Sequence, residues 1–346
     1  MTPKHEILTP ALLLNLDAFE ASLTRMAAHV ARAGKNLRPH AKAHKCLEIA
    51  RRQIAAGAIG MCAATVGEAE MLNRAGLAEI LLTSPLADPL KIARIVATGA
   101  MVVVDHHRQA EWYQQAAASA GRSVDVLVDL DVGDHRTGAA STAQALAIAQ
   151  AVDRSSHLKL RGLQAYSVHG SHAGDFAERV RVSTEVFACA KETQDAMARA
   201  GLSTEILSGG STGTWNIDTG IAALTELQAG SYLLMDVAYR RVGVDFPNAL
   251  TVLATVVSAN HDAFVTVDGG FKAFASDRGY GPDALALPGS SYRWGGDEFG
   301  YLDVSPQPRV GDKIEFIPPH CDPTVNLYDR MYACRGGVVE AVWPLK

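Results

Sequence analysis

Residues 101–130 read MVVVDHHRQAEWYQQAAASAGRSVDVLVDL, and this stretch decides the fold. Two apolar runs, Met101–Val104 and Val124–Leu130, stand on either side of Gln109–Ala120, an Ala-rich segment whose apolar residues have helical spacing. A strand, a helix and a second strand in this order predict parallel pairing, because parallel neighbours need a long crossover connection. The stretch is therefore typical of an α/β protein.

The same alternation continues from about residue 37 to residue 228. It contains eight candidate strands separated by helical segments, which predict a closed (β/α)8 barrel rather than an open sheet. The candidate strands are Leu37–Lys42, Ile59–Ala63, Ile80–Thr83, Met101–Val104, Val124–Leu130, Arg161–Ser167, Glu205–Ser208 and Leu224–Gln228.

Beyond Arg240 the helical spacing ends, and short apolar runs alternate with loops rich in Gly, Pro, Asn and Asp. These runs predict a second, all-β domain. We expect the barrel to span residues 18–235 and the β domain to span residues 236–346, while residues 1–17 supply a strand that joins the β domain. The expected strands of the β domain are Thr251–Ala259, Ala263–Asp268, Lys313–Ile317 and Gly337–Val342.

Composition narrows the class of protein. The chain has 346 residues, a formal net charge of −5 and no run of basic residues, which argues against nucleic-acid binding. No stretch of roughly 18 apolar residues predicts a membrane span, and the N-terminus lacks the apolar core of a signal peptide. The five cysteines form no paired motif, so we expect reduced thiols and a cytoplasmic protein.

The stretch RPHAKAHK at residues 38–45 places Lys42 at the end of the first candidate strand. Two histidines, a second lysine and an arginine surround Lys42, and such neighbours favour the neutral, nucleophilic amine. A neutral lysine is suited to a Schiff base with an aldehyde cofactor. A solvated basic turn is the plainer interpretation of the same residues.

The ends of the later strands are dense in titratable and polar residues, and working residues of a (β/α)8 barrel occupy these ends. The loop SGGSTGT predicts a phosphate cradle, because glycines let backbone amides approach an anion and hydroxyls add donors. A general base is expected at His172 or His169, and spacing alone does not choose between them. The complete set is Asp131, Asp134, His135, Arg136, Tyr166, His169, His172, Ser208–Thr214, Gln228 and Gly230.

The β domain contributes His320-Cys321-Asp322. On an extended segment, residues two apart point the same way, so His320 and Asp322 would share one metal ion while Cys321 faces away. One imidazole and one carboxylate suit Mn²⁺ or Mg²⁺ better than a zinc site rich in thiolates, although Zn²⁺ stays open. Because two protein ligands are few, we expect an exchangeable, catalytic metal.

Together these motifs resemble the fold-type III pyridoxal-phosphate enzymes of the D-threonine aldolase and D-serine dehydratase group, over the whole chain. The resemblance rests on residues 38–45, 166–172 and 208–214, on LQAGSY at residues 227–232, and on PHCDPTVN at residues 319–326. It implies an alanine-racemase-like barrel with a C-terminal β domain, a homodimer, and a pyridoxal phosphate held by Lys42.

The resemblance also implies roles for single residues. Arg136 would contact the ring oxygen of the cofactor, Tyr166 would pack beside the ring, and His172 would be the catalytic histidine. Gln228 matches the position where related racemases place an arginine near the pyridine nitrogen. The remaining cofactor contacts implied are Ser208, Gly210, Ser211, Thr212, Gly213 and Tyr232, and the metal ligands implied are His320 and Asp322.

The expected reaction is a metal-dependent retro-aldol cleavage of D-threonine and other D-β-hydroxy-α-amino acids to glycine and an aldehyde. His320-x-Asp322 resembles the aldolases, whereas the dehydratases carry His-x-Cys. The alternatives within the group are a D-serine or D-threo-3-hydroxyaspartate dehydratase and a 3-hydroxy-D-aspartate aldolase. Two alternatives lie outside this enzyme group. The first is a non-catalytic pyridoxal-phosphate carrier, which would lack the β domain. The second is a cofactor-free metal hydrolase, which would be colourless when purified.

Overall fold

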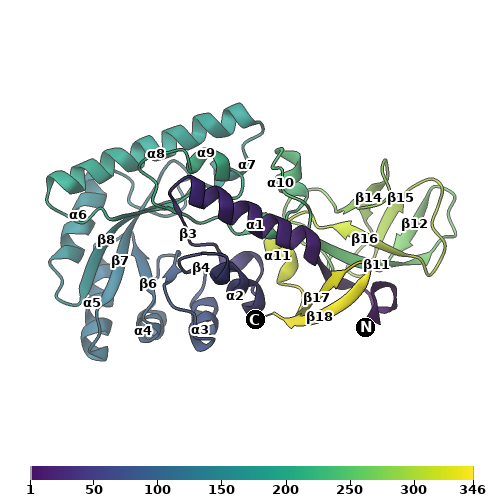
Figure 1. Cartoon of the computed structure of the whole chain (residues 1–346), viewed down its shortest axis with the longest axis horizontal. Coiled ribbons are helices and arrows are strands. Elements are labelled where there is room, and N and C mark those ends of the chain that lie inside the picture. Colours follow the sequence, from purple (N-terminus) through teal and green to yellow (C-terminus); the bar gives the residue numbers. More distant parts are fainter. Residues whose placement is uncertain (1, 346) are drawn as a thin grey trace. The chain divides into compact units, whose positions relative to one another are not determined.

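The computed structural model describes residues 2–345 and divides them into two compact units (Figure 1). The barrel unit comprises Met26–Lys42 and Ile49–Gly230. The β unit comprises the rest of the described chain, including the short segment Ala43–Glu48. Among residues 2–345, every helix is too short or too polar to cross a lipid bilayer.

The barrel unit is built on eight parallel strands in the order β3-β10-β9-β8-β7-β6-β5-β4. A parallel bridge between His40 and Cys62 joins the segment after β3 to β4, which closes the sheet and confirms the predicted barrel. Apolar side chains of several strands pack together, among them Leu81, Val103 and Leu127. The strands are β3 (Asn36–Leu37), β4 (Met61–Ala63), β5 (Ile80–Leu82), β6 (Met101–Val104), β7 (Val124–Leu130), β8 (Leu158–Ala165), β9 (Ile206–Gly209) and β10 (Glu226–Leu227).

Helices connect the strands, and local sequence sets their ends. Helix α4, for example, begins after Asp88, whose side chain accepts a hydrogen bond from the Leu90 N–H at 2.9 Å, and it ends at Gly99, which has a φ of 75°. Acidic N-caps and left-handed glycine C-caps satisfy backbone groups that the helix leaves unpaired. The main helices are α1 (Leu16–Arg32), α2 (Leu47–Ala55), α3 (Val66–Arg74), α4 (Pro89–Thr98), α5 (His107–Ala120), α6 (Thr142–Asp153), α7 (Val168–His172), α8 (Phe176–Arg199) and α9 (Trp215–Asp218).

The first strand is shorter than predicted. The ladder covers only Asn36–Leu37, and Lys42 lies in the 3₁₀ turn η2 (Ala41–Ala43) instead of at a strand end. Pro39 has no N–H to donate to a ladder, so regular pairing cannot run through it. The prediction of a strand over Leu37–Lys42 was therefore wrong in its second half, although the His40 bridge keeps this segment at the barrel wall.

A buried ion pair ties the first and last barrel strands together. Arg38 donates to both carboxylate oxygens of Glu226, at 3.0 and 2.8 Å, and each side chain is only 3% exposed. We expect Arg38→Met to lower the free energy of unfolding by about 3–5 kcal/mol, because it leaves a buried carboxylate without its partner.

Urea unfolding measures this loss, and Arg94→Met is the matched control. Arg94 makes the same two-point contact with Glu70, at 2.8 and 2.6 Å, but its side chain is 59% exposed. Breaking an exposed pair should cost about 0–1 kcal/mol. Equal losses in the two variants would contradict a special role for the Arg38–Glu226 pair.

The β unit is a ten-stranded sheet in which β2 (Ala11–Asn15) lies between β11 (Leu250–Ser258) and β17 (Arg330–Arg335). Strands β11, β12 (Phe264–Val267), β16 (Lys313–Ile317) and β18 (Val338–Pro344) correspond to the four predicted runs, which confirms the C-terminal all-β domain. Strands β14 (Ser291–Trp294), β15 (Gly300–Asp303) and β17 were not predicted. Along β14 the exposed and half-buried residues alternate, so the strand has no continuous apolar run. The remaining strands are β1 (Thr2–Pro3) and β13 (Asp283–Ala284), and two short helices are α10 (Val237–Arg241) and α11 (Cys321–Val325).

Candidate active site

Three predicted site residues meet at the mouth of the barrel. The Nζ atom of Lys42 lies 5.7 Å from the ring centroid of Tyr166, and the Cζ atom of Arg136 lies 5.2 Å from the same centroid. Both distances are within the range of a cation–π interaction. Tyr166 directly follows β8, so its ring brings together the lysine after β3 and the arginine after β7.

The two histidines after β8 lie on helix α7. The carboxylate of Asp134, in the loop after β7, accepts hydrogen bonds from the Ser167 hydroxyl at 3.0 Å and from the His169 N–H at 3.2 Å. Ser167 also caps the helix by accepting from the Gly170 N–H at 3.0 Å. His169 is exposed, whereas His172 is half-buried and its Nδ1 atom is enclosed.

The glycine-rich loop after β9 packs directly against helix α7. A Cβ atom on Gly213 would lie 1.8 Å from the carbonyl oxygen of Ser171, and Gly210 has a φ of 73°, so both positions require glycine. The three hydroxyl residues of this loop are buried, and helix α9 begins directly after the last of them. They are Ser211, Thr212 and Thr214. This close backbone approach and this hydroxyl set fit a phosphate group.

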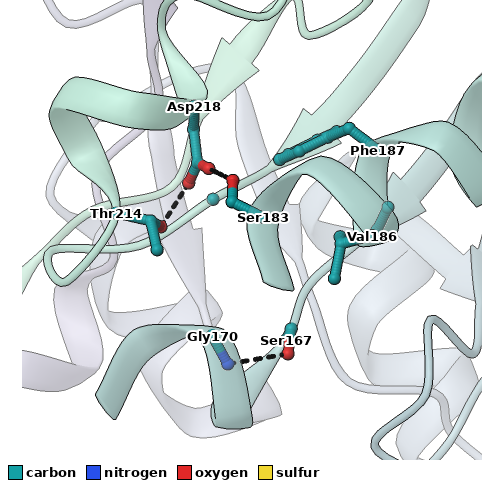
Figure 2. A pocket seen from close by; sticks show the side chains of 9 residues that line it. Ser167, Gly170, Ser183, Val186, Phe187, Thr214 and Asp218 are labelled. Carbon is teal, nitrogen blue, oxygen red and sulfur yellow. Dashed lines mark hydrogen bonds between the residues drawn. The ribbon is translucent and has the colours of Figure 1, made fainter. Parts of the chain in front are cut away.

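A buried carboxylate that the sequence analysis missed shapes this loop (Figure 2). Asp218 accepts hydrogen bonds from the hydroxyls of Thr214 and Ser183, and Thr214 is also 2.9 Å from the Ser211 hydroxyl. Burial raises the pKa of Asp218 to about 6. The adjoining cavity, of about 10 Å³, is at the lower limit for one water molecule, and it is lined by Ala165, Ser167, Gly170, Ser183, Val186, Phe187, Gly210, Thr214 and Asp218. The four-residue spacing of Thr214 and Asp218 on a helix is the pattern that could have indicated the pair.

The raised pKa of Asp218 predicts a pH dependence of stability. A carboxyl whose pKa is about 6 when folded and about 4 when unfolded binds more protons in the folded state between these values. Its contribution to stability therefore falls as the pH rises from about 4 to about 6. Asp218→Asn removes this component, so the variant should gain about 1–3 kcal/mol relative to the wild type between pH 4 and pH 7.

Urea unfolding of the cofactor-free wild type and variant across this pH range measures the difference. Asp303→Asn provides the control, because Arg293 lowers the pKa of that exposed carboxyl. Stability curves of wild type and Asp218→Asn that stay parallel would contradict the raised pKa.

A second buried network crosses the interior of the barrel. Gln228, which follows β10, donates from Nε2 to the Ser208 hydroxyl at 3.0 Å and to Gln164 Oε1 at 3.2 Å. Gln164 in turn donates from its Nε2 to Asp129 at 2.8 Å and to the carbonyl oxygen of Thr83 at 2.9 Å. Ser208 and Gln228 were predicted as site residues, whereas Thr83, Asp129 and Gln164 were not. Burial raises the pKa of Asp129 to about 6.

The β unit carries the predicted metal pair, but not on an extended segment. His320 directly precedes helix α11, and Asp322 lies in its first turn, so the argument from strand alternation was wrong. The Nδ1 atom of His320 lies 2.7 Å from the carboxylate of Asp277, and the Asp322 carboxylate accepts from the Ser231 hydroxyl at 3.1 Å. Burial raises the pKa of the Cys321 thiol, which lies between the two predicted ligands.

These residues fit a weakly held divalent ion. A histidine that binds a metal commonly directs its other ring nitrogen to a carboxylate, as His320 does with Asp277. Within residues 2–345, no group of three or more His, Cys, Asp or Glu side chains is arranged to hold a metal, so the protein would offer two ligands. The Nε2 atom of His320 is 3.4 Å from Arg278 Nη2, and a bound ion would have to displace this guanidinium.

Tyr232, the last predicted contact, belongs to the β unit and follows Ser231 in the 3₁₀ turn η3 (Ser231–Leu233). Its ring is fully buried and lies 5.6 Å from the ring of Phe246, measured between centroids. In the barrel unit, Gly230 also approaches the main chain, because a Cβ atom there would lie 2.5 Å from the His40 carbonyl oxygen.

Two protein families match the chain. Residues 14–238 match the alanine racemase N-terminal domain, and residues 249–334 match a putative serine dehydratase domain. A D-threonine aldolase of Arthrobacter sp. is 37% identical, with 99% of this chain and 93% of the relative covered. A 3-hydroxy-D-aspartate aldolase of Paracoccus denitrificans is 34% identical, with 99% and 92% covered.

Solved structures of related enzymes are similar to this chain over nearly its whole length. The D-threonine aldolase of Filomicrobium marinum has a TM-score of 0.97 and 35% identity, with 99% of this chain and 96% of that chain covered. A metal-free form of a D-threo-3-hydroxyaspartate dehydratase has a TM-score of 0.93 and 25% identity, with 100% and 99% covered.

Proposed function

Because the chain belongs to the alanine-racemase-like, fold-type III family, in the group of D-threonine aldolases and serine dehydratases, we propose that it cleaves D-threonine to glycine and acetaldehyde. The similar relatives include D-threonine and 3-hydroxy-D-aspartate aldolases, and the chain is itself a lyase of this group. The similarity to a D-threonine aldolase over 99% of the chain carries the proposal. Other D-β-hydroxy-α-amino acids would be substrates of the same reaction.

The barrel unit would hold pyridoxal phosphate, the cofactor that the family implies. Lys42 would attach it through the side-chain amine, Arg136 and Tyr166 would hold the ring, and the loop from Gly210 to Thr214 would bind the phosphate. When bound, the cofactor accepts the electron pair of the bond that breaks. The meeting of Lys42 and Arg136 at one tyrosine ring supports this assignment.

His172 would act as the general base. The proton of the β-hydroxyl would move to the imidazole of His172. The Cα–Cβ bond of the substrate then breaks, the hydroxyl-bearing carbon leaves as the aldehyde, and Cα takes a proton to give glycine. The backbone of Ser171 lies against Gly213 of the glycine-rich loop, and this contact supports a position of helix α7 next to the proposed phosphate site.

His320 and Asp322 would hold a divalent ion, Mn²⁺ by preference, with Mg²⁺ or Zn²⁺ as alternatives. A bound ion supplies Lewis acidity that lowers the pKa of the substrate hydroxyl. Asp277 would fix the His320 ring for this purpose. We further propose a homodimer in the cytoplasm, in keeping with the family resemblance.

Removal of the metal should abolish the reaction. We expect a chelator to lower the rate of aldehyde release at least about 100-fold, because Lewis-acid assistance contributes several kcal/mol, and Mn²⁺ to restore it. Asp322→Ala should be slow with or without Mn²⁺. Asp303→Ala, which removes an exposed carboxylate of the same unit, should behave as the wild type. Full activity in excess chelator would refute the metal site.

A second candidate function is cleavage of 3-hydroxy-D-aspartate to glycine and glyoxylate. The 34% identity to a 3-hydroxy-D-aspartate aldolase favours it. A dehydratase is the remaining alternative, and Asp322 at the position of the dehydratase cysteine argues against it.

Product analysis separates the three functions. The purified protein is incubated with pyridoxal phosphate, Mn²⁺ and either D-threonine or 3-hydroxy-D-aspartate, and the carbon products are identified. Glycine with acetaldehyde supports the D-threonine aldolase. Preference for 3-hydroxy-D-aspartate, measured as kcat/KM, would favour the second candidate. Release of ammonia with 2-oxobutanoate from D-threonine would overturn the proposal.

A further inference from the structure

The buried carboxylate of Asp218 takes up hydrogen-bond donors of the loop after β9. It accepts from the hydroxyls of Thr214 and Ser183 (Figure 2) and from the Ser211 N–H. These four residues are each at most 5% exposed. A Cβ atom on Gly210 would lie 2.6 Å from the carboxylate, so glycine at this position lets the loop close on it. The loop is therefore built around a negative charge of the chain's own.

An ionised Asp218 sets the direction of the neighbouring hydroxyl hydrogen bonds. Thr214 has one hydroxyl proton and must donate it to Asp218, because an ionised carboxylate can only accept. The Ser211 hydroxyl lies 2.9 Å from that of Thr214 and must then be the donor between the two. The Ser211 proton is thereby used inside the protein and is not available to a bound anion.

Protonation of Asp218 permits the opposite direction along the hydroxyl chain, by which we mean Ser211, Thr214 and Asp218. The carboxyl would donate to the Thr214 oxygen, Thr214 would donate to the Ser211 oxygen, and the Ser211 O–H would become free for a ligand. One proton enters at the carboxyl and one O–H becomes available at the other end, so the protons balance. The same proton removes a negative charge that would repel a phosphate group.

The surroundings of Asp218 make this proton uptake possible near neutral pH. Burial raises the pKa of Asp218 to about 6, against the opposing effect of its hydrogen bonds, and no charged side chain within residues 2–345 contributes. The elements around it carry His29 on α1, His172 on α7 and Arg179 on α8, and none of the three shifts this pKa. The carboxyl is therefore mostly ionised above pH 7, and its protonation costs little free energy.

We propose that Asp218 is a positioning residue that couples phosphate binding to the uptake of one proton: its carboxyl is protonated when the loop holds a phosphate group, and the reversed hydroxyl chain makes the Ser211 O–H available to that group. The inference rests on the proposed function, because it takes this loop as the phosphate site. Its consequence is that phosphate is held less tightly as the pH rises above about 6.

Infrared difference spectroscopy tests the proton uptake directly. Spectra of the cofactor-free protein at pH 8 are recorded with and without pyridoxine 5′-phosphate, which has the phosphate group but no aldehyde to react with Lys42. All but about 1% of the Asp218 carboxyl is ionised at this pH before the ligand binds. We expect the ligand to produce the C=O band of a protonated carboxylic acid in the wild type and no such band in Asp218→Asn.

The affinity for the same ligand gives a second measurement. The amide of Asp218→Asn can donate to Thr214 and accept from Ser183, as the protonated carboxyl would. We expect this variant to bind about 100-fold more tightly than the wild type at pH 8 and about twofold more tightly at pH 6, because the binding-competent fraction of the wild type falls with pH. Asp195→Asn is the matched control, since its carboxyl pairs with Lys191 on the surface of α8, and it should follow the wild type.

Ser211→Ala separates the hydroxyl chain from simple charge repulsion. The variant keeps every partner of Asp218 but has no hydroxyl to release, so its affinity should lose the pH dependence between pH 6 and pH 8. An undiminished dependence in Ser211→Ala would overturn the hydroxyl chain, and this result decides the matter if Asp218→Asn does not fold. Binding to the wild type without a carboxylic-acid band overturns the proposal. Failure of the wild type to bind the ligand at either pH would refute the proposed phosphate site, and with it the proposed function.

Discussion

Lys42→Ala is expected to lose the visible absorbance of the bound cofactor together with aldehyde release from D-threonine. The amine at this position would be the covalent attachment point, and alanine has no group to replace it. Removal of a covalent catalytic group should lower kcat by about four orders of magnitude or more. Absorbance spectra of the protein reconstituted with pyridoxal phosphate, together with single-turnover assays, measure both effects.

Lys45→Ala distinguishes this role from that of a basic turn. Lys45 lies three residues further along the same motif and its ammonium donates a hydrogen bond to Asn326. If the motif only supplied positive charge, the two variants would behave alike. Borohydride reduction of the wild type, followed by peptide mass analysis, should find the cofactor on Lys42. A normal absorbance band in Lys42→Ala would refute the assignment.

The barrel could be predicted because several of its strands, such as β5 and β6, are buried runs of apolar residues. Val124–Leu130 and Met101–Val104 appear in the structure with the bounds that the sequence indicated. The prediction of strand bounds failed where a feature other than hydrophobicity ends the strand. Pro39, which has no N–H to donate, ends the hydrogen-bond ladder of β3. The prediction also failed for β14, where a tyrosine and a tryptophan alternate with exposed residues and no apolar run marks the strand.

The sequence predicted Lys42, Arg136 and Tyr166 as site residues, and the structure brings these three together. Arg136 and Tyr166 follow predicted strands, so the barrel pattern alone indicates them. The contacts of the buried network inside the barrel could not be predicted. Its members are separated by 35 residues between Asp129 and Gln164 and by 64 between Gln164 and Gln228, and polar residues inside a strand usually face solvent. Asp277 is similarly remote, 43 residues before His320. Residues this far apart in the sequence come into contact only because the sheet closes and the loops fold, so the sequence alone does not indicate their pairing.

His172→Ala is expected to retain the cofactor absorbance and to lose turnover. A positioned general base contributes about 100- to 10,000-fold, so kcat should fall by this factor. The loss should appear in kcat more than in KM, because the proton moves only in the transition state. Since Ser167 and Asp134 hold helix α7 through its backbone, truncation of one side chain should leave the helix in place.

His169→Ala is the matched control, since it changes the exposed histidine of the same helix. If His172 is the base, His169→Ala should turn over at nearly the wild-type rate, because it removes only an exposed ring. The reverse result, a slow His169→Ala and a fast His172→Ala, would move the base to His169. Near-normal rates in both variants would mean that neither imidazole takes the proton and that a water molecule or the metal site must do so.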